Sequence, residues 1–320
     1  MIDYHLDALS RQYTKVDYVP PDISDYASGN RGVPYVWSYG SPVTGPQVVI
    51  LGSMHGNEIA GACILENFVR SGINIDSGGV SFAFGNPDAY QKFDPQHPYL
   101  GRFLDVDINR VWGPELEDAT DTRAEVLRAR ELRPVIESAD FVLDLHTMQG
   151  EGSPIAIVTN KSATMDLVAA MPSLEFVLSG KMHQAERIRL RDFGRFGDLQ
   201  SDAVAIQVQV GQHWRASALD NGQQVVWDFL NATGITPSER RSRGPGPRRL
   251  KIIETVAAAS EFEFADDYEN GAFFPTRGTI VGYVGVEREP VKTPVDRCHL
   301  IMPVHFRQPG GNCFRFAVEE

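Results

Sequence analysis

Apolar runs of strand length alternate with segments of helical periodicity over the first two thirds of the chain. Residues 48–51 and 141–146 are mainly apolar and lead into polar residues, as buried strands do. Residues 57–70 and 122–139 place apolar side chains at helical spacing instead. This alternation predicts an α/β fold whose central sheet, mainly parallel or mixed, is flanked by helices. The remaining predicted strands are 35–39, 80–84, 155–158, 175–178 and 203–210, and the remaining predicted helices are 162–171 and 214–233.

The pattern changes near residue 234. Residues 234–249 are rich in Pro, Gly and Arg, and we interpret them as a linker between two domains, 1–240 and 250–320. Short apolar runs separated by Gly and Pro follow, a pattern typical of a small all-β domain. These predicted strands are 250–256, 279–284, 300–304 and 313–318.

Three stretches depart from the regular alternation. Residues 1–34 predict a short helix followed by an irregular arm. Residues 88–121 form a loop rich in Asp, Pro and Gly, and loops of this length in compact domains are usually functional or disordered. Pro134 falls inside the predicted helix 122–139, where a kink or break is expected because proline lacks the N–H that the helix needs.

Composition narrows the class of protein. The 320-residue chain is 42% hydrophobic and 22% charged, as ordinary globular proteins are. A formal net charge of -12 argues against binding to nucleic acid or to an anionic membrane. Neither a membrane-spanning apolar stretch nor a secretory leader is evident, so we expect a cytoplasmic protein, with a homo-oligomer possible. Three cysteines without a CxxC pair suggest neither disulfides nor a thiolate zinc site.

Histidines follow two of the predicted strands. His55 and Glu58 lie in the turn after the strand 48–51, where an imidazole and a carboxylate can bind one cation. Taken alone, they could equally be ordinary residues at the start of a helix. His146 ends the strand 141–146 and would complete a typical catalytic zinc site of three protein ligands. Asp144 shares its strand face and could orient an imidazole, although it could also be an ordinary strand-end acid.

The long loop adds further candidates. Arg102, Asn109 and Arg110 would suit an anionic substrate near a metal, because one guanidinium can polarise a carbonyl while another holds a carboxylate. Without context, arginines in such a loop are more often surface residues.

Together these stretches resemble a known family. The sequences Gly52–Glu58, Gly85–Pro87, Arg102 followed by Asp107–Arg110, and Asp144–His146 are similar to those of the succinylglutamate desuccinylase/aspartoacylase family of zinc carboxypeptidase-like hydrolases. The resemblance extends from about residue 46 to 233, and a small C-terminal β domain also fits this family.

This resemblance implies a catalytic domain over residues 1–240 and one Zn²⁺ per chain, bound by His55, Glu58 and His146. It also implies that Asn109 and Arg110 hold the amino-acid portion of the substrate. Arg102 would stabilise charge on the carbonyl oxygen.

The chain departs from the family at the general base. The resemblance implies a glutamate two residues before Gly211, where this chain has Gln209. A glutamine can hydrogen-bond a water molecule but cannot accept a proton at neutral pH. Three explanations are open. The substitution could have been introduced deliberately to hold substrate unreacted, or it could be natural with another residue, such as Glu151 or His213, as the base. The chain could also be a natural binding protein that has lost hydrolysis. The family also implies an arginine before this strand that binds a carboxylate, and Arg187, Arg189, Arg191 and Arg195 are all candidates.

The leading hypothesis is a zinc-dependent amidohydrolase that removes a short acyl group from an N-acyl amino acid or related small anionic molecule. One alternative is a non-hydrolytic, zinc-containing protein that binds a small ligand. Another is a carboxypeptidase that acts on peptides. The sequence leaves open the acyl group and the amine partner.

Overall fold

A computed structural model describes residues 15–179, 187–237, 245–258, 261–305 and 311–320. The predicted N-terminal helix lies outside this part of the chain. The first described elements are a 3-10 turn, η1 (Ser24–Tyr26), and the strands β1 (Val36–Gly40), β2 (Gln47–Gly52) and β3 (Gly79–Phe84). Strands β4 (Phe141–Met148), β5 (Ile155–Val158), β6 (Phe176–Ser179) and β7 (Val204–Gln212) follow, each within two residues of its predicted bounds.

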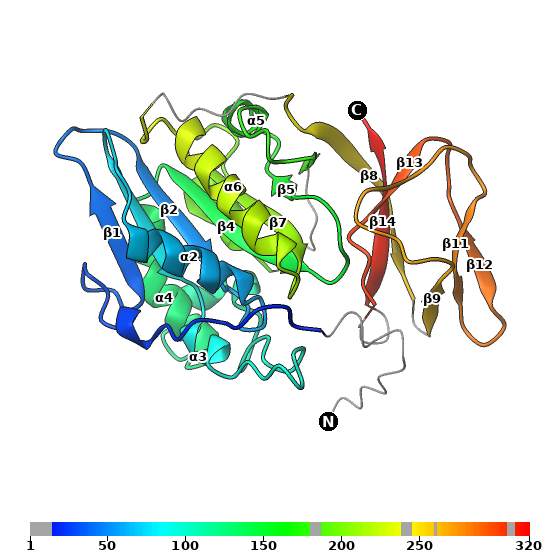
Figure 1. The fold of residues 1–320 in the computed structure, drawn as a ribbon, viewed down its shortest axis with the longest axis horizontal. Coiled ribbons are helices and arrows are strands. Elements are labelled where there is room, and N and C mark those ends of the chain that lie inside the picture. Colours follow the sequence, from blue (N-terminus) through cyan, green and yellow to red (C-terminus); the bar gives the residue numbers. More distant parts are fainter. Residues whose placement is uncertain (1–14, 180–186, 238–244, 259–260, 306–310) are drawn as a thin grey trace.

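These strands lie side by side in one sheet, in the order β1-β3-β2-β4-β7-β5-β6 (Figure 1). The central group β3-β2-β4-β7 is parallel, whereas β1 and β5 run antiparallel to their neighbours β3 and β7. The sheet is therefore mixed, as predicted. Because β2, β4 and β7 are parallel neighbours, their carboxyl ends meet at the same edge, where open α/β sheets place their sites.

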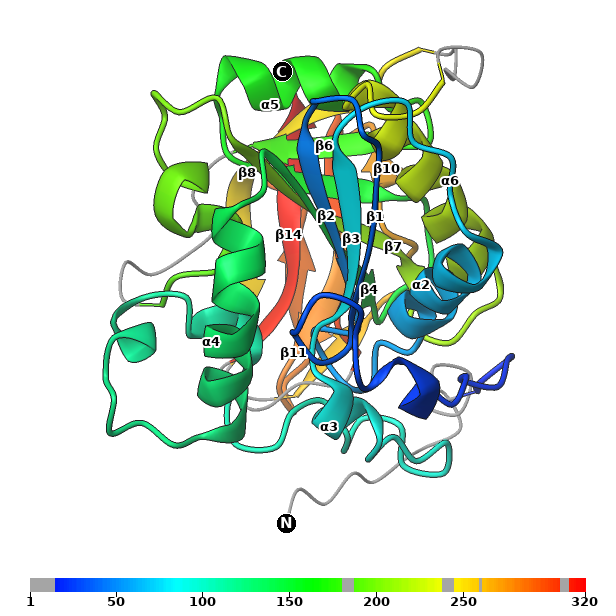
Figure 2. The same ribbon diagram turned by 90° about the vertical axis from the view of Figure 1, so that its left-hand side faces the viewer.

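Helices cover both faces of this sheet (Figure 2). On one face, α2 (Ala60–Ser71), α5 (Ser162–Ala169) and α6 (Ser217–Ala232) bury a large apolar cluster against the strands. On the other face, α4 (Ala124–Glu137) encloses a second cluster that includes Trp112. The break expected at Pro134 is wrong. Helix α4 continues to Glu137, because a proline in the last turn removes only one hydrogen bond.

The predicted loop 88–121 carries short elements of its own. These are α3 (Pro87–Tyr90) and the 3-10 turns η2 (Ile108–Arg110) and η3 (Pro114–Leu116). Two more 3-10 turns, η4 (Leu190–Asp192) and η5 (Gly194–Phe196), precede β7. The second half of the loop and the segment before β7 pack on the side of the sheet that α4 covers, since Ile108, Leu190 and Phe196 belong to its cluster. The first half packs on the opposite face, where Tyr90 belongs to the cluster of α2 and α6.

The C-terminal residues form the predicted all-β region. The long strand β8 (Arg248–Ala257) pairs with β6 at its start and with β14 (Asn312–Glu319) along most of its length. The sheet continues through β13 (Cys298–Ile301) to β10 (Ala272–Phe274). Strands β9 (Phe262–Phe264), β11 (Ile280–Val284) and β12 (Glu289–Lys292) form a second antiparallel sheet, and an aromatic-rich core lies between the two.

Strand β13 begins and ends earlier than predicted. It ends at Ile301 because Met302 has a positive φ of 53°, which interrupts the extended backbone. The predicted division into domains at 234–249 stays a prediction, although β8 gives both regions a continuous sheet. Among the described residues, no helix is both long and apolar enough to cross a bilayer.

Candidate metal centre

The turn after β2 depends on close backbone contact. A Cβ on Gly52 would lie 2.7 Å from the carbonyl oxygen of Gly61, so two glycines let the first turn of α2 pack directly against the strand end. Ser53 then turns the chain with a φ of 53°, and its hydroxyl donates to the carbonyl of Glu58. The apolar strand and the amphipathic helix thereby fix the turn that carries His55 and Glu58.

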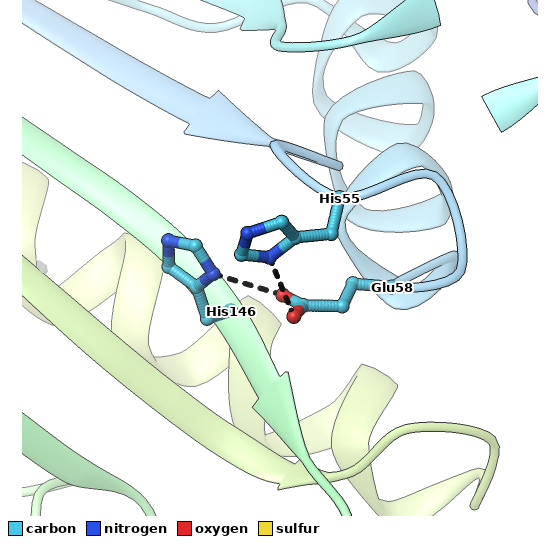
Figure 3. A group of neighbouring side chains, drawn as sticks. All are labelled: His55, Glu58 and His146. Atoms are coloured by element: carbon cyan, nitrogen blue, oxygen red, sulfur yellow. Dashed lines mark hydrogen bonds and ion pairs between the residues drawn. The ribbon is translucent and has the colours of Figure 1, made fainter. Parts of the chain in front are cut away.

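His55, Glu58 and His146 converge at the carboxyl edge of the sheet (Figure 3). One ligand atom from each of the three lies within 4.8 Å of the others, and all three residues are buried. Nδ1 of His55 lies 2.8 Å from one oxygen of Glu58, and Nδ1 of His146 lies 2.9 Å from the other. The structure thus brings together the three residues that the sequence proposed as metal ligands.

A carboxylate orients each imidazole from behind. Nε2 of His146 lies 2.8 Å from Asp144, the partner that the sequence suggested. Nε2 of His55 lies 2.9 Å from Asp107, which sequence reasoning missed. Metal-binding histidines typically have such a partner, because it fixes the tautomer and leaves the other nitrogen free for the ion. The sequence signal that could have identified Asp107 is its position at the start of the stretch Asp107–Arg110. In the structure it also caps η2, where it accepts from the N–H of Asn109.

The electrostatics of this cluster favour positive charge. Burial lowers the pKa of His146, but Asp144 and Glu58 outweigh burial and raise it to about 10. Burial raises the pKa of Glu58, yet the two histidines hold it well below its ordinary value. Buried carboxylates that stay ionised need compensating positive charge. This donor set fits a zinc ion: it comprises two imidazole nitrogens and one carboxylate, with a further carboxylate behind each histidine.

The buried carboxylate of Glu125, on α4, holds the loop that carries Arg102 and Asp107. It accepts from the backbone N–H groups of Leu104, Asp105 and Val106, and from the side chain of Asn86. The N–H of Gly56 also donates to the carbonyl of Arg102. Hydrogen bonds thus hold the long loop to both α4 and the turn that carries His55.

Arg102 reaches the cluster from this loop. Its Nη1 donates to Glu58 over 3.1 Å, and its Nη2 lies 3.0 Å from Nε2 of His55. The side chain is 37% exposed, so one edge of the guanidinium is open to a ligand. Its predicted position beside the metal ligands is consistent with this geometry.

Asn109 and Arg110 take different positions. The Asn109 amide lies 3.3 Å from both Asp144 and His146, and its oxygen accepts from the N–H of Leu190. Arg110 donates to its neighbour's carbonyl and lies 3.8 Å from Asp107. Both residues line the cavity described below, but Asn109 also braces the second histidine and its carboxylate.

Strand β7 supplies the opposite part of the site. Gln209 lies directly across the ladder from His146, and Gln207 across from Asp144, so all four side chains project from the same face. Gln209 is 4% exposed, and its Oε1 has no hydrogen-bond partner among the described residues. Gln207 accepts a long hydrogen bond of 3.4 Å from Arg189.

The structure distinguishes among the candidates for the carboxylate-binding arginine and for the alternative base. Of the four arginines before β7, only Arg189 lines the cavity. Burial and the neighbouring arginines lower its pKa to about 9, and its Nε has no partner in the described chain. Of the two alternative bases, Glu151 instead pairs with Arg215 outside the cavity. His213 lines the cavity.

The cavity has a volume of about 380 Å³ and contains both the metal-ligand cluster and residues from the C-terminal β region. Arg315, on β14, also lines it, and burial lowers its pKa. Sequence reasoning missed these C-terminal wall residues, since short strands carry no pattern that indicates a site. The wall comprises Met302, Pro303, Val304, Asn312 and Arg315.

Comparisons with known proteins agree with this arrangement. The chain is 30% identical over 131 residues to an N-acyl-aromatic-L-amino acid amidohydrolase (carboxylate-forming) of Xenopus laevis, covering 38% of this chain and 41% of that protein. It is 30% identical over 111 residues to the aspartoacylase of Mus musculus, covering 31% and 33% respectively. The chain thus spans less than half the length of these curated relatives.

Solved structures share the fold at low identity. Murine aminoacylase 3 has a TM-score of 0.66 at 17% identity, over 88% of this chain and 97% of that one. An ectoine utilization protein from Ruegeria pomeroyi has a TM-score of 0.67 at 16% identity, over 94% and 93%.

The mixed sheet carries at its carboxyl edge a His–Glu–His cluster that could hold a metal ion. The family model for the succinylglutamate desuccinylase/aspartoacylase catalytic domain matches residues 44–232, more than half of the chain. The chain belongs to that family, as its motifs predicted.

Proposed function

We propose that the protein is a zinc-dependent amidohydrolase that removes a short acyl group from an N-acyl amino acid or a related small molecule. The observation that carries this proposal is the buried His55–Glu58–His146 cluster with a carboxylate behind each imidazole. These three residues would hold one zinc ion per chain. The relatives named as amidohydrolases and aspartoacylase support the class of reaction.

The charge in the cavity supports an anionic substrate. Four arginines line it, namely Arg102, Arg110, Arg189 and Arg315. Burial lowers the pKa values of Arg110, Arg189 and Arg315, so their desolvation is not fully compensated by acidic neighbours. A carboxylate bound between them would supply that compensation. The limited volume and the C-terminal wall favour a small substrate over a peptide, which weighs against the carboxypeptidase alternative.

The roles of the residues follow from their positions. Arg102 would stabilise negative charge on the carbonyl oxygen, since its guanidinium already lies beside the metal ligands. Arg110 and Asn109 would hold the amino-acid portion, and Gln209 would accept a hydrogen bond from the attacking water through its unpartnered Oε1. When bound, zinc would polarise the carbonyl and make that water more acidic. A separate group must accept the proton, because the amide of Gln209 cannot.

The test combines metal analysis with a panel of N-acetyl, N-formyl and N-succinyl amino acids. The expected result is one zinc per chain and hydrolysis of at least one anionic member, with release of a free amine. Protein that binds no zinc and leaves the whole panel intact would contradict the proposal. The exposed His97 offers a matched control, since His97→Ala should change neither zinc content nor turnover.

A second candidate is a non-hydrolytic zinc-containing protein that binds a small ligand. It is favoured by Gln209, which occupies the position where the family has its base. Tight binding of an N-acyl amino acid by calorimetry, with no turnover by either the wild type or Gln209→Glu, would favour this binder. Turnover by the wild type would exclude it.

A further inference from the structure

His213 lies at the end of β7, beside the metal-ligand cluster. Its backbone N–H donates to the carbonyl of Met148 at the end of β4, over 2.9 Å. Its ring packs against Trp214 and Tyr99, with ring centroids 5.2 Å and 6.3 Å away. The residue is 4% exposed and lines the same cavity as His55, Glu58 and His146. Backbone and ring contacts therefore fix an imidazole at the cavity wall.

The two ring nitrogens of His213 have different surroundings. Nδ1 is hydrogen-bonded to the hydroxyl of Thr147 over 2.6 Å. Thr147 is itself fixed, because its backbone N–H donates to Glu58 over 3.2 Å. No described residue forms a hydrogen bond with Nε2. If Nδ1 donates its proton to the Thr147 hydroxyl, Nε2 carries a free lone pair.

We propose that Nε2 of His213 is the general base of this protein, in place of the carboxylate that Gln209 lacks. The inference rests on the proposed function. Gln209 positions the water through Oε1, and His213 receives its proton. Thr147 is a positioning residue: in this proposal its hydroxyl accepts the proton on Nδ1, which leaves Nε2 free.

The proposed step balances. As the water oxygen forms its bond to the carbonyl carbon, one water proton passes to Nε2 and the imidazole becomes cationic. The C–N bond then breaks, and the same proton passes from Nε2 to the leaving nitrogen. The products are the free acid and the amine, and the imidazole returns to its neutral form.

The surroundings of His213 keep the imidazole neutral between turnovers. Burial is the main cause that lowers the pKa of His213 to about 4; Glu58 opposes it, and Arg102, His55 and His146 add to it. An imidazole of low pKa is deprotonated at pH 7 and is therefore available to accept a proton.

A first experiment reads the tautomer without reference to activity. Two-bond ¹H–¹⁵N correlation spectra of ¹⁵N-histidine-labelled protein, assigned with His213→Asn, should show Nδ1 protonated and Nε2 bare. Thr147→Val should disturb this pattern, and Thr147→Ser, which keeps the hydroxyl, should restore it. A proton on Nε2 in the wild type would overturn the proposal.

A second experiment measures turnover of an N-acyl amino acid by zinc-loaded protein. His213→Asn and His213→Ala should lower kcat by about 10²-fold or more, and added imidazole should partly restore the alanine variant. In a Gln209→Glu background, His213→Asn should cost much less, because a carboxylate then takes the proton. Thermal unfolding and zinc content should match the wild type, and His97→Asn is the control on an exposed histidine.

The outcomes separate the two proposals. Unchanged kcat in His213→Asn overturns the role of His213 and leaves the amidohydrolase intact. Turnover by Gln209→Glu alone also overturns it, since the natural imidazole would then be no effective base. Failure of both the wild type and Gln209→Glu on the whole panel contradicts the proposed function itself.

Discussion

The two sides of the cavity differ in how completely their polar atoms are paired. In the His55–Glu58–His146 cluster on the β2–β4 side, both nitrogens of each histidine and both oxygens of Glu58 have partners. Behind this cluster, Oδ1 of Asp144 has no partner among the described residues. On the β7 side, Gln209 has a buried oxygen without a partner, and Nε2 of His213 forms no hydrogen bond with a described residue. Both sides come from neighbouring parallel strands of the same sheet.

This difference indicates a division of labour. Buried polar atoms are costly unless they are paired, so a fully paired cluster is suited to hold an ion in a fixed position. Atoms that remain unpaired at a cavity wall are suited to partners that come and go, such as water and substrate. The contrast can be tested from either side.

The largest effect is expected on the paired side. His146→Ala removes one of the three proposed ligands and leaves Asp144 without the imidazole that it contacts. Zinc affinity should fall by more than about 100-fold, since changes to outer-shell residues alone cost 10–100-fold. Metal content after dialysis against a graded chelator measures the effect. Full zinc occupancy in this variant would contradict the metal assignment.

On the unpaired side, Gln209→Glu should raise kcat. It supplies a carboxylate where the amide oxygen now lies without a partner, and a positioned general base contributes about 10²- to 10⁴-fold. Because His213 already offers a base in the proposal, we expect a gain near the lower limit. Steady-state kinetics on the best substrate of the panel decide it. A lower kcat in the variant would count against a water site at residue 209.

A milder change on the paired side is Asp107→Asn. It preserves shape but removes the negative charge behind His55. Zinc affinity should fall by about 10-fold to 100-fold while the fold is retained, and Asp144→Asn should behave alike. Competition with a colorimetric chelator measures the change. Equal affinities in the wild type and both variants would show that neither carboxylate orients its imidazole.

The smallest effect is expected at the C-terminal wall. Arg315→Met keeps the length of the side chain but removes a charge from the cavity. If Arg315 contacts the substrate carboxylate in ground and transition states alike, KM should rise about 10-fold with little change in kcat. Arg315→Lys should recover part of this loss. An unaltered KM in Arg315→Met would place the substrate elsewhere in the cavity.

The sequence predicted one side of the site better than the other. His55 and His146 could be found because each follows an apolar strand, and neighbouring parallel strands end at a common edge. Asp107 was not recognised as a partner of His55, because its contact spans 52 positions and depends on how Glu125 folds the loop. Arg189 could not be singled out among four arginines, because η4 lacks a period that indicates which side chain faces inward.

The C-terminal region was the harder part of the fold. Strands β9, β10 and β12 have three or four residues each, too few to establish an alternating pattern. Arg315 was therefore not expected in the cavity. Its position depends on pairing between β14 and β8.

That pairing has a mechanical consequence. Because β8 is bonded to β6 near its start and to β14 beyond, the wall that carries Arg315 cannot swing away as a rigid lid without breaking ladder hydrogen bonds. The shape of the folded cavity would then determine which substrates bind, without a closing motion at each turnover. Substitutions that weaken the pairing of β8 with β6 and β14 should therefore alter substrate selection before they unfold the protein.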